Sequence, residues 1–183
     1  ILGNQVHDAR VTRHQQAEGW VQIEGVDGHA TATRGLLLTV TVADCIPAFL
    51  GAPTVGAISL LHSGWRGTAG GILRHGVTAL VEGYGATPAD IVMHCGVGIC
   101  GECYEVGPEV MEGCGLAAAG AGPFHADLRG VLAGQARQLG LQIISTSQWC
   151  SAHDRTHFYS HRASRGADGR MVAYLGYPTT DPA

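Results

Sequence analysis

The sequence contains no lysine, so its eleven basic residues are all arginine. Only 14% of its residues are charged, and the formal net charge is −4. This balance provides no general attraction to nucleic acid or to an anionic membrane surface, so we expect neither as a partner. An arginine inside a pocket could still bind a phosphate through its planar guanidinium group.

Long apolar runs are also absent. No stretch approaches the 18 uninterrupted apolar residues of a membrane-spanning helix, so no span is predicted. Cysteine is sparse, with six residues among 183, and no secretory signal is recognisable. We therefore predict reduced thiols and a cytoplasmic location rather than a disulfide framework.

The length and the 45% hydrophobic content predict one compact soluble domain over residues 1–183. Hydrophobic periodicity alternates between the period of a strand and that of a helix, which predicts an α/β fold. The expected strands are 36–42, 55–61, 91–93, 141–146 and 171–174. The expected helices are 68–82, 108–114 and 127–139, the last capped by Asp127, and 113–122 is expected to be a glycine-rich loop.

Reactive side chains follow three of the apolar runs. Asp44 and Cys45 come after the first, His62 and Arg66 after the second, and a loop with Cys100 and Cys103 after the third. Because open sheets bind ligands beyond their strand ends, we expect these segments to share one cleft.

His62, Cys103 and His125 are candidate zinc ligands. Thiolate and imidazole are usual ligands of zinc, and a catalytic zinc keeps one of its four positions open. The spacing of the three residues matches no short zinc motif, so the residues alone leave open that Cys103 is a small buried side chain and that each histidine is an ordinary polar residue.

Two other patterns compete for a metal. Cys100 and Cys103 form a CxxC pair, but no second pair lies at zinc-finger spacing, which argues against a structural zinc there. His153, His157 and His161 recur every four residues, and we interpret them as a polar surface run rather than as a second metal site.

Several ordered motifs identify a known family. They are Gln5-Val6-His7, Thr41-Val42-Ala43-Asp44-Cys45-Ile46-Pro47, His62-Ser63-Gly64-Trp65-Arg66-Gly67, Cys103-Tyr104-Glu105-Val106-Gly107, His125-Ala126-Asp127-Leu128, and Phe158-Tyr159-Ser160-His161-Arg162 with Gly169-Arg170. With these motifs the chain resembles the laccase-domain family, whose members were first called multicopper polyphenol oxidases and are now regarded as purine nucleoside phosphorylases with adenosine deaminase activity.

The resemblance implies an α/β fold of layers in the order α-β-β-α with mixed sheets, similar to the cysteine hydrolase-like fold. Family members usually carry a further segment before the Gln5-Val6-His7 motif, and we expect the present chain to lack it. The resemblance also implies that zinc is bound by His62, Cys103 and His125.

The activity implied is zinc-dependent phosphorolysis of adenosine, inosine, guanosine or methylthioadenosine, together with deamination of adenosine. The partners are then a purine nucleoside and phosphate. We expect Asp44 and Cys45 to transfer protons, Cys103 and His125 to take part in catalysis with the metal, and His7 to line the pocket. Arg66 and Arg162 are expected to bind phosphate, although a structural ion pair is an open alternative for both.

Two alternatives remain from the sequence. One is a copper-dependent polyphenol oxidase, against which the absence of any His-x-His sequence counts, because multicopper clusters are typically built from paired histidines. The other is a metal-free hydrolase with Cys103 as nucleophile and His125 as base.

Overall fold

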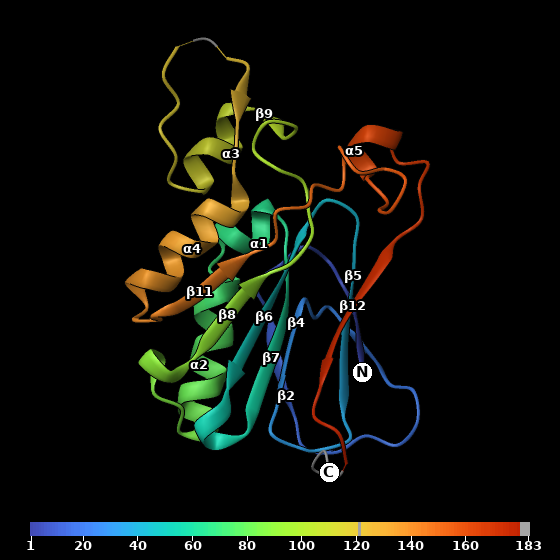
Figure 1. Ribbon diagram of the computed structural model, residues 1–183, viewed down its shortest axis with the longest axis vertical. Helices are drawn as coiled ribbons and strands as arrows, with labels where there is room; N and C mark the ends of the chain where they lie inside the picture. The colour runs from blue at the N-terminus through green and yellow to red at the C-terminus, as the bar shows by residue number, and fades with distance from the viewer. Residues whose placement is uncertain (121, 180–183) are drawn as a thin grey trace.

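Two β-sheets form the centre of the molecule in the computed structural model, which describes residues 1–120 and 122–179 (Figure 1). The larger sheet has the strand order β11-β8-β6-β7-β4-β2, and the smaller sheet has the order β12-β5-β1-β3. The larger sheet contains β11 (Ile143–Thr146), β8 (Val92–Cys95), β6 (Ile46–Ala52), β7 (Ala57–Ser63), β4 (Gly28–Thr31) and β2 (Val11–His14). The smaller contains β12 (Met171–Gly176), β5 (Leu37–Val42), β1 (Leu2–Asn4) and β3 (Gln22–Glu24).

Both sheets are mixed. In the larger sheet β11 pairs with β8 and β4 with β2 in parallel, while the pairs around β6 and β7 are antiparallel. In the smaller sheet β5, β1 and β3 are parallel and β12 is antiparallel to β5. A separate two-stranded antiparallel sheet is formed by β9 (Glu105–Val106) and β10 (Phe124–His125).

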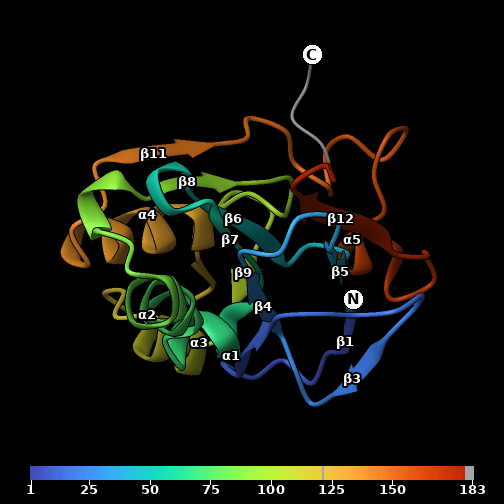
Figure 2. The ribbon, with the colours of Figure 1, turned by 90° about the horizontal axis from the view of Figure 1, so that it is seen from below.

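The longer helices cover one face of the larger sheet, and the smaller sheet packs on its other face (Figure 2). The helices are α1 (Trp65–Ala69), α2 (Ile72–Tyr84), α3 (Pro108–Gly113) and α4 (Leu128–Gln138), with short 3-10 turns at Pro53–Val55 and Pro88–Asp90. The four-residue α5 (His161–Ser164) lies beside one end of the smaller sheet (Figure 1). The predicted α/β class with mixed sheets is confirmed.

Two hydrophobic cores hold these layers together. One lies between the helices and the larger sheet and includes Leu61, Leu73 and Leu80. The other lies between the two sheets, where Leu38 and Val40 of β5 meet Leu60 of β7. Because β7 is buried along its whole length, it contributes side chains to both cores, and its residues from Ala57 to Leu61 are apolar except for Ser59.

Several predicted elements differ from the observed ones. The helix expected over 68–82 is two helices, because Gly71 adopts a left-handed φ of 81° at the start of α2 and breaks the first helix. The expected cap of α4 is confirmed, since the Asp127 side chain accepts a hydrogen bond from the backbone N–H of Arg129 at 3.1 Å. The glycine-rich loop expected over 113–122 includes residue 121, which lies outside the described residues.

The short strands β1 to β4 near the N-terminus have no counterpart among the predicted elements, because runs of three or four residues carry little periodicity. Within the described residues, every helix is too short or too polar to cross a membrane.

Candidate functional site

Loops at one end of the two sheets surround a cavity of about 630 Å³. Its walls come from the segment before β2, the β5–β6 turn, the start of α1 and the loop around α5. The structure places six of the predicted site residues around it, namely His7, Asp44, Cys45, His62, Arg66 and Arg162. Tyr104 and Arg170 also line the cavity.

The carboxylate of Asp27 organises this end of the molecule. It is fully buried just before β4 and accepts backbone hydrogen bonds from Val6, His7 and Asp8 at 3.0 to 3.1 Å. Its Oδ1 also lies 2.8 Å from Nδ1 of His62. Burial favours the neutral acid, but these hydrogen bonds outweigh it and lower the pKa of Asp27. Asp27 therefore fixes both the loop that carries His7 and the orientation of the His62 ring.

His62, Cys45 and His7 form a compact group beside this carboxylate. One ligand atom from each of the three lies within 4.8 Å of the others, and the two imidazole rings meet edge to face at 4.9 Å between centroids. Burial opposes charge on both partners, yet the histidines lower the pKa of Cys45 to about 7, and Asp27 and Cys45 raise the pKa of His62 to about 9. The group is thus a thiol, an imidazole and a carboxylate in series, an arrangement suited to moving protons.

Asp44 lines the same cavity, but both of its carboxylate oxygens have partners. Oδ1 accepts a hydrogen bond from the Ser151 hydroxyl at 2.7 Å, and Oδ2 accepts one from the backbone N–H of Arg162 at 2.6 Å. Asp44 is buried and has a φ of 86°, a conformation that non-glycine residues rarely adopt. These contacts assign Asp44 to holding the loops that surround the cavity.

The predicted phosphate-binding arginines carry their charge at the cavity wall. The guanidinium of Arg66 stacks on the Trp65 ring at 4.6 Å, and that of Arg162 stacks on Tyr104 at 5.1 Å. Arg162 also donates to the backbone carbonyl of Glu105. Within the described residues neither arginine forms an ion pair with a carboxylate, which argues against the structural ion pair considered as the alternative.

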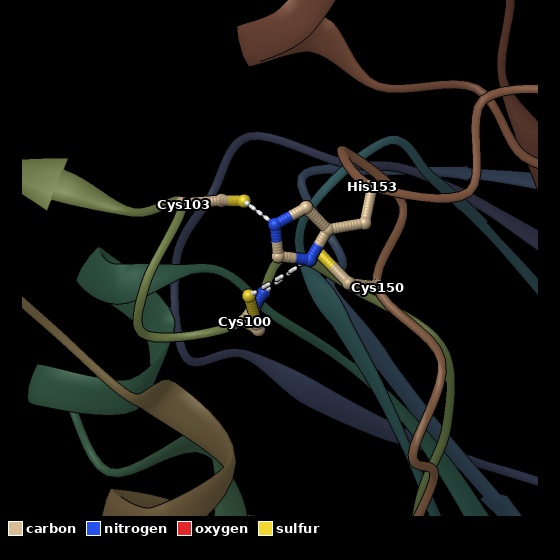
Figure 3. A group of neighbouring side chains, drawn as sticks. All are labelled: Cys100, Cys103, Cys150 and His153. Carbon is tan, nitrogen blue, oxygen red and sulfur yellow. Dashed lines mark hydrogen bonds between the residues drawn. The ribbon is translucent and has the colours of Figure 1, made fainter.

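Cys103 belongs to a second group, away from His62. It lies with Cys100, Cys150 and His153, and one ligand atom from each of the four lies within 4.8 Å of the others (Figure 3). The Sγ of Cys103 is 3.2 Å from Nε2 of His153, and the Sγ of Cys100 is 3.7 Å from Nδ1 of the same ring. Such a Cys3His cluster could hold a metal ion.

The expected ligand set of His62, Cys103 and His125 does not assemble. Among the described residues its three ligand atoms do not gather within 4.8 Å, and neither Cys103 nor His125 lines the cavity around His62. Cys103 is turned toward His153, and His125 is exposed on β10. The residues as arranged do not fit a zinc ion shared by these three side chains, so no catalytic step is derived from one.

The metal-free pairing of Cys103 with His125 meets the same difficulty. The imidazole beside Cys103 is that of His153, and in the described chain no hydrogen bond joins Cys103 to His125. The thiol that does lie beside a buried, carboxylate-bound histidine is Cys45.

Sequence reasoning did not single out Asp27, Cys150 or Tyr104. The only signal for Asp27 was a charged residue between apolar and glycine residues at the start of a short strand. Cys150 and His153 were visible as a CxxH pair, but their distance in sequence from Cys100 and Cys103 concealed the connection. The interpretation of His153 as part of a polar surface run does not account for its contacts with two thiols.

Comparison with known proteins defines the class. The model of the family described as multi-copper polyphenol oxidoreductase laccase matches residues 1–177, so the chain belongs to this family. A purine nucleoside phosphorylase of Deinococcus radiodurans is 40% identical over 181 residues, which cover 96% of this chain and 69% of that protein. An adenosine deaminase, RL5, from an unknown prokaryotic organism is 32% identical and covers 88% of this chain and 69% of its own length.

Solved structures show the same fold. YlmD from Geobacillus stearothermophilus matches with a TM-score of 0.88 and 32% identity, covering 95% of this chain and 72% of that one. The hypothetical protein YfiH of Bacillus licheniformis matches with a TM-score of 0.92 and 26% identity, covering 97% and 73%. The relatives named for an activity are enzymes of purine nucleosides, and their names do not support copper or oxidoreductase chemistry.

Proposed function

We propose that this protein is a purine nucleoside phosphorylase that converts adenosine, inosine, guanosine or methylthioadenosine and phosphate into the free base and a ribose 1-phosphate. The observation that carries the proposal is that two arginines, neither of which forms an ion pair with a carboxylate of the described residues, share one cavity with the Asp27-bound His62. The names of the relatives agree with this chemistry.

The cavity suits the two substrates together. Its volume of about 630 Å³ lies within the range of about 300 to 1,000 Å³ usual for small-molecule sites. Apolar side chains of Leu2, Ile99 and Leu128 line it along with Tyr104, and a purine ring can pack against such surfaces. The guanidinium groups of Arg66 and Arg162 can bind phosphate oxygens in bidentate fashion.

The reaction needs a nucleophile and a proton. A phosphate oxygen attacks C1′ of the ribose, the bond from C1′ to the purine nitrogen breaks, and its electron pair goes to the base. We assign the proton that the departing base takes up to the His62 and Cys45 pair, since Asp27 keeps His62 protonated. The arginines offset the charge of the attacking phosphate.

Adenosine deamination is a second candidate, favoured by the similarity to RL5. In that reaction water replaces the amino group at C6 of the purine, and ammonia leaves. The same pair of Cys45 and His62 would take a proton from water and return it to the leaving group. This reaction consumes no phosphate.

One assay separates the two reactions. The protein is incubated with adenosine with and without phosphate, and chromatography follows adenine, hypoxanthine and inosine. Phosphorolysis predicts adenine only when phosphate is present, whereas deamination predicts inosine in both samples. His62→Ala should lose at least about a hundredfold in rate, as expected for loss of a general acid.

The matched control is His94→Ala, which removes an exposed imidazole of β8 that contacts Ser145. Its rate should equal that of the unmodified protein. Release of base that does not depend on phosphate, or unchanged turnover in His62→Ala, would contradict the proposal.

A further inference from the structure

We propose that Cys100, Cys103, Cys150 and His153 bind a structural zinc ion that fastens the loop before β9 to the loop after β11. This site differs from the ligand set of His62, Cys103 and His125 that the family resemblance implies. It does not depend on the nucleoside chemistry proposed above.

The first support is the ligand set. Three thiols and one imidazole converge within 4.8 Å, and Cys3His is a closed donor set found in structural zinc sites (Figure 3). Four protein ligands leave no open position for water, which distinguishes this cluster from a catalytic centre. Thiolate donors disfavour magnesium or calcium, which prefer oxygen.

The second support is the spacing. Cys100 and Cys103 are separated by two residues, and so are Cys150 and His153, so each pair has the short separation seen on one side of a zinc finger. In the first pair the backbone carbonyl of Cys100 accepts hydrogen bonds from the N–H groups of Cys103 and Tyr104 at 3.2 and 3.0 Å. This tight turn brings both sulfurs to the same side of the loop.

The third support is that the second pair is held from several directions. The carbonyl of Cys150 accepts a hydrogen bond from the N–H of Asp154, whose carboxylate accepts one in return from the N–H of Cys150. Arg129 donates to the carbonyls of Ser147 and Trp149, which fixes the approach to Cys150. Hydrogen bonds around the ligands orient a metal site, and here they are in place.

The two pairs already meet through the protein. The N–H of Cys100 lies 3.3 Å from the Sγ of Cys150, and Gly98 forms an isolated parallel β-bridge with Cys150. Protonated thiols that pack together stabilise the folded state only weakly. A divalent cation binds the same groups as thiolates, and their protons are released to solvent. Zinc would thus stabilise a junction between segments about fifty residues apart.

The test measures bound zinc on the full chain. Protein purified in reducing buffer without chelator is analysed by inductively coupled plasma mass spectrometry, and about one zinc per chain is expected. Cys150→Ser and His153→Ala should each weaken zinc binding by at least about tenfold. Loss of a residue that only hydrogen-bonds to a metal ligand already weakens metal binding by about ten- to a hundredfold, so loss of a ligand should weaken it at least as much. X-ray absorption at the zinc edge should report three sulfurs and one nitrogen.

Two controls discriminate between ligand sets. Cys114→Ser removes a buried thiol beside Trp65 that lies outside the cluster, and it should leave zinc content unchanged. His62→Ala also should leave it unchanged, whereas a zinc ion held by the family-implied set, or by the group of His7, Cys45 and His62, predicts its loss. Cys103 belongs to both sets, so its variants do not separate them.

The proposal would be overturned by wild-type zinc content in both Cys150→Ser and His153→Ala. An absorption spectrum with one sulfur and two nitrogens would overturn it as well. So would a protein that binds no zinc and carries a disulfide between Cys100 and Cys150, which mass spectrometry under non-reducing conditions detects. Loss of zinc with retained phosphorolysis would leave the enzymatic proposal standing, so the two proposals can fail independently.

Discussion

The carboxylate of Asp44 binds the hydroxyl of Ser151, 107 positions later in the chain, at 2.7 Å. Its other oxygen binds the backbone N–H of Arg162. One buried side chain therefore connects the β5–β6 turn to the segment that follows Cys150 and to the loop that carries the proposed phosphate ligand. The cysteine cluster and the cavity around His62 are joined through this carboxylate.

Asp44→Asn tests that connection. Asparagine tolerates the positive φ at this position, but its amide cannot accept both hydrogen bonds as well as a carboxylate does. We expect a loss of about 1 to 3 kcal/mol in the free energy of unfolding, measured by urea denaturation, and a lower kcat/KM. Asp90→Asn, at an exposed carboxylate in a 3-10 turn, is the control and should change neither value. Equal stability of the two variants would refute the role assigned to Asp44.

Arg66→Gln and Arg162→Gln should raise the KM for phosphate by roughly ten- to a hundredfold each, because a hydrogen bond to a charged group is worth about 1.5 to 3 kcal/mol. The KM for the nucleoside should change less. Initial rates at varied phosphate and saturating nucleoside provide the measurement. Arg74→Gln, on the exposed face of α2, serves as control. An unchanged phosphate KM in both cavity variants would remove the arginines from the phosphate site.

Gly98→Ala should destabilise the cavity wall. A Cβ at this position would lie 2.7 Å from the Asp44 carbonyl oxygen and would also collide with the Ile46 side chain. Since backbone cannot yield as a flexible side chain can, we expect a cost of about 1 to 3 kcal/mol in thermal or urea unfolding. Gly51→Ala is the matched control, because nothing lies within 4 Å of a Cβ built there. Similar unfolding curves for the two variants would show that the close approach at Gly98 is not a constraint.

Acid should destabilise the protein through the buried pair of His14 and His29. Nε2 of His14 lies 3.0 Å from Nδ1 of His29, and Nε2 of His29 is buried without a hydrogen-bond partner among the described residues. Burial, followed by the charge of His14, lowers the pKa of His29 to about 3, far below its ordinary value of 6.5. The folded state therefore keeps this ring neutral at a pH where the unfolded state binds a proton.

The resulting stability is complete above about pH 6.5 and falls as the pH drops from there toward 3, by up to about 1.4 kcal/mol per pH unit for this group. Urea denaturation at a series of pH values gives the slope. His29→Gln removes the proton-binding group and should flatten the slope between about pH 6 and 4. An identical slope in the variant would mean that other groups cause the acid loss.

Local sequence determined much of the framework. The apolar runs at β5 and β7, the proline at the start of α3 and the Asp127 cap of α4 act through neighbouring residues, so their effects can be read along the chain. The motifs also identified the family and the residues Cys45, His62, Arg66 and Arg162 that the structure places around one cavity.

Only the tertiary structure decided which of these side chains meet. Cys103 turns to Cys150 and His153 rather than to His62, and His62 turns to Asp27, a residue that the sequence analysis did not single out. Partners of this kind lie far apart in the chain and are brought together by strand order and loop packing, which local periodicity does not encode. Residue types and spacing establish what chemistry a side chain is capable of. The packed fold determines which partner residue it contacts.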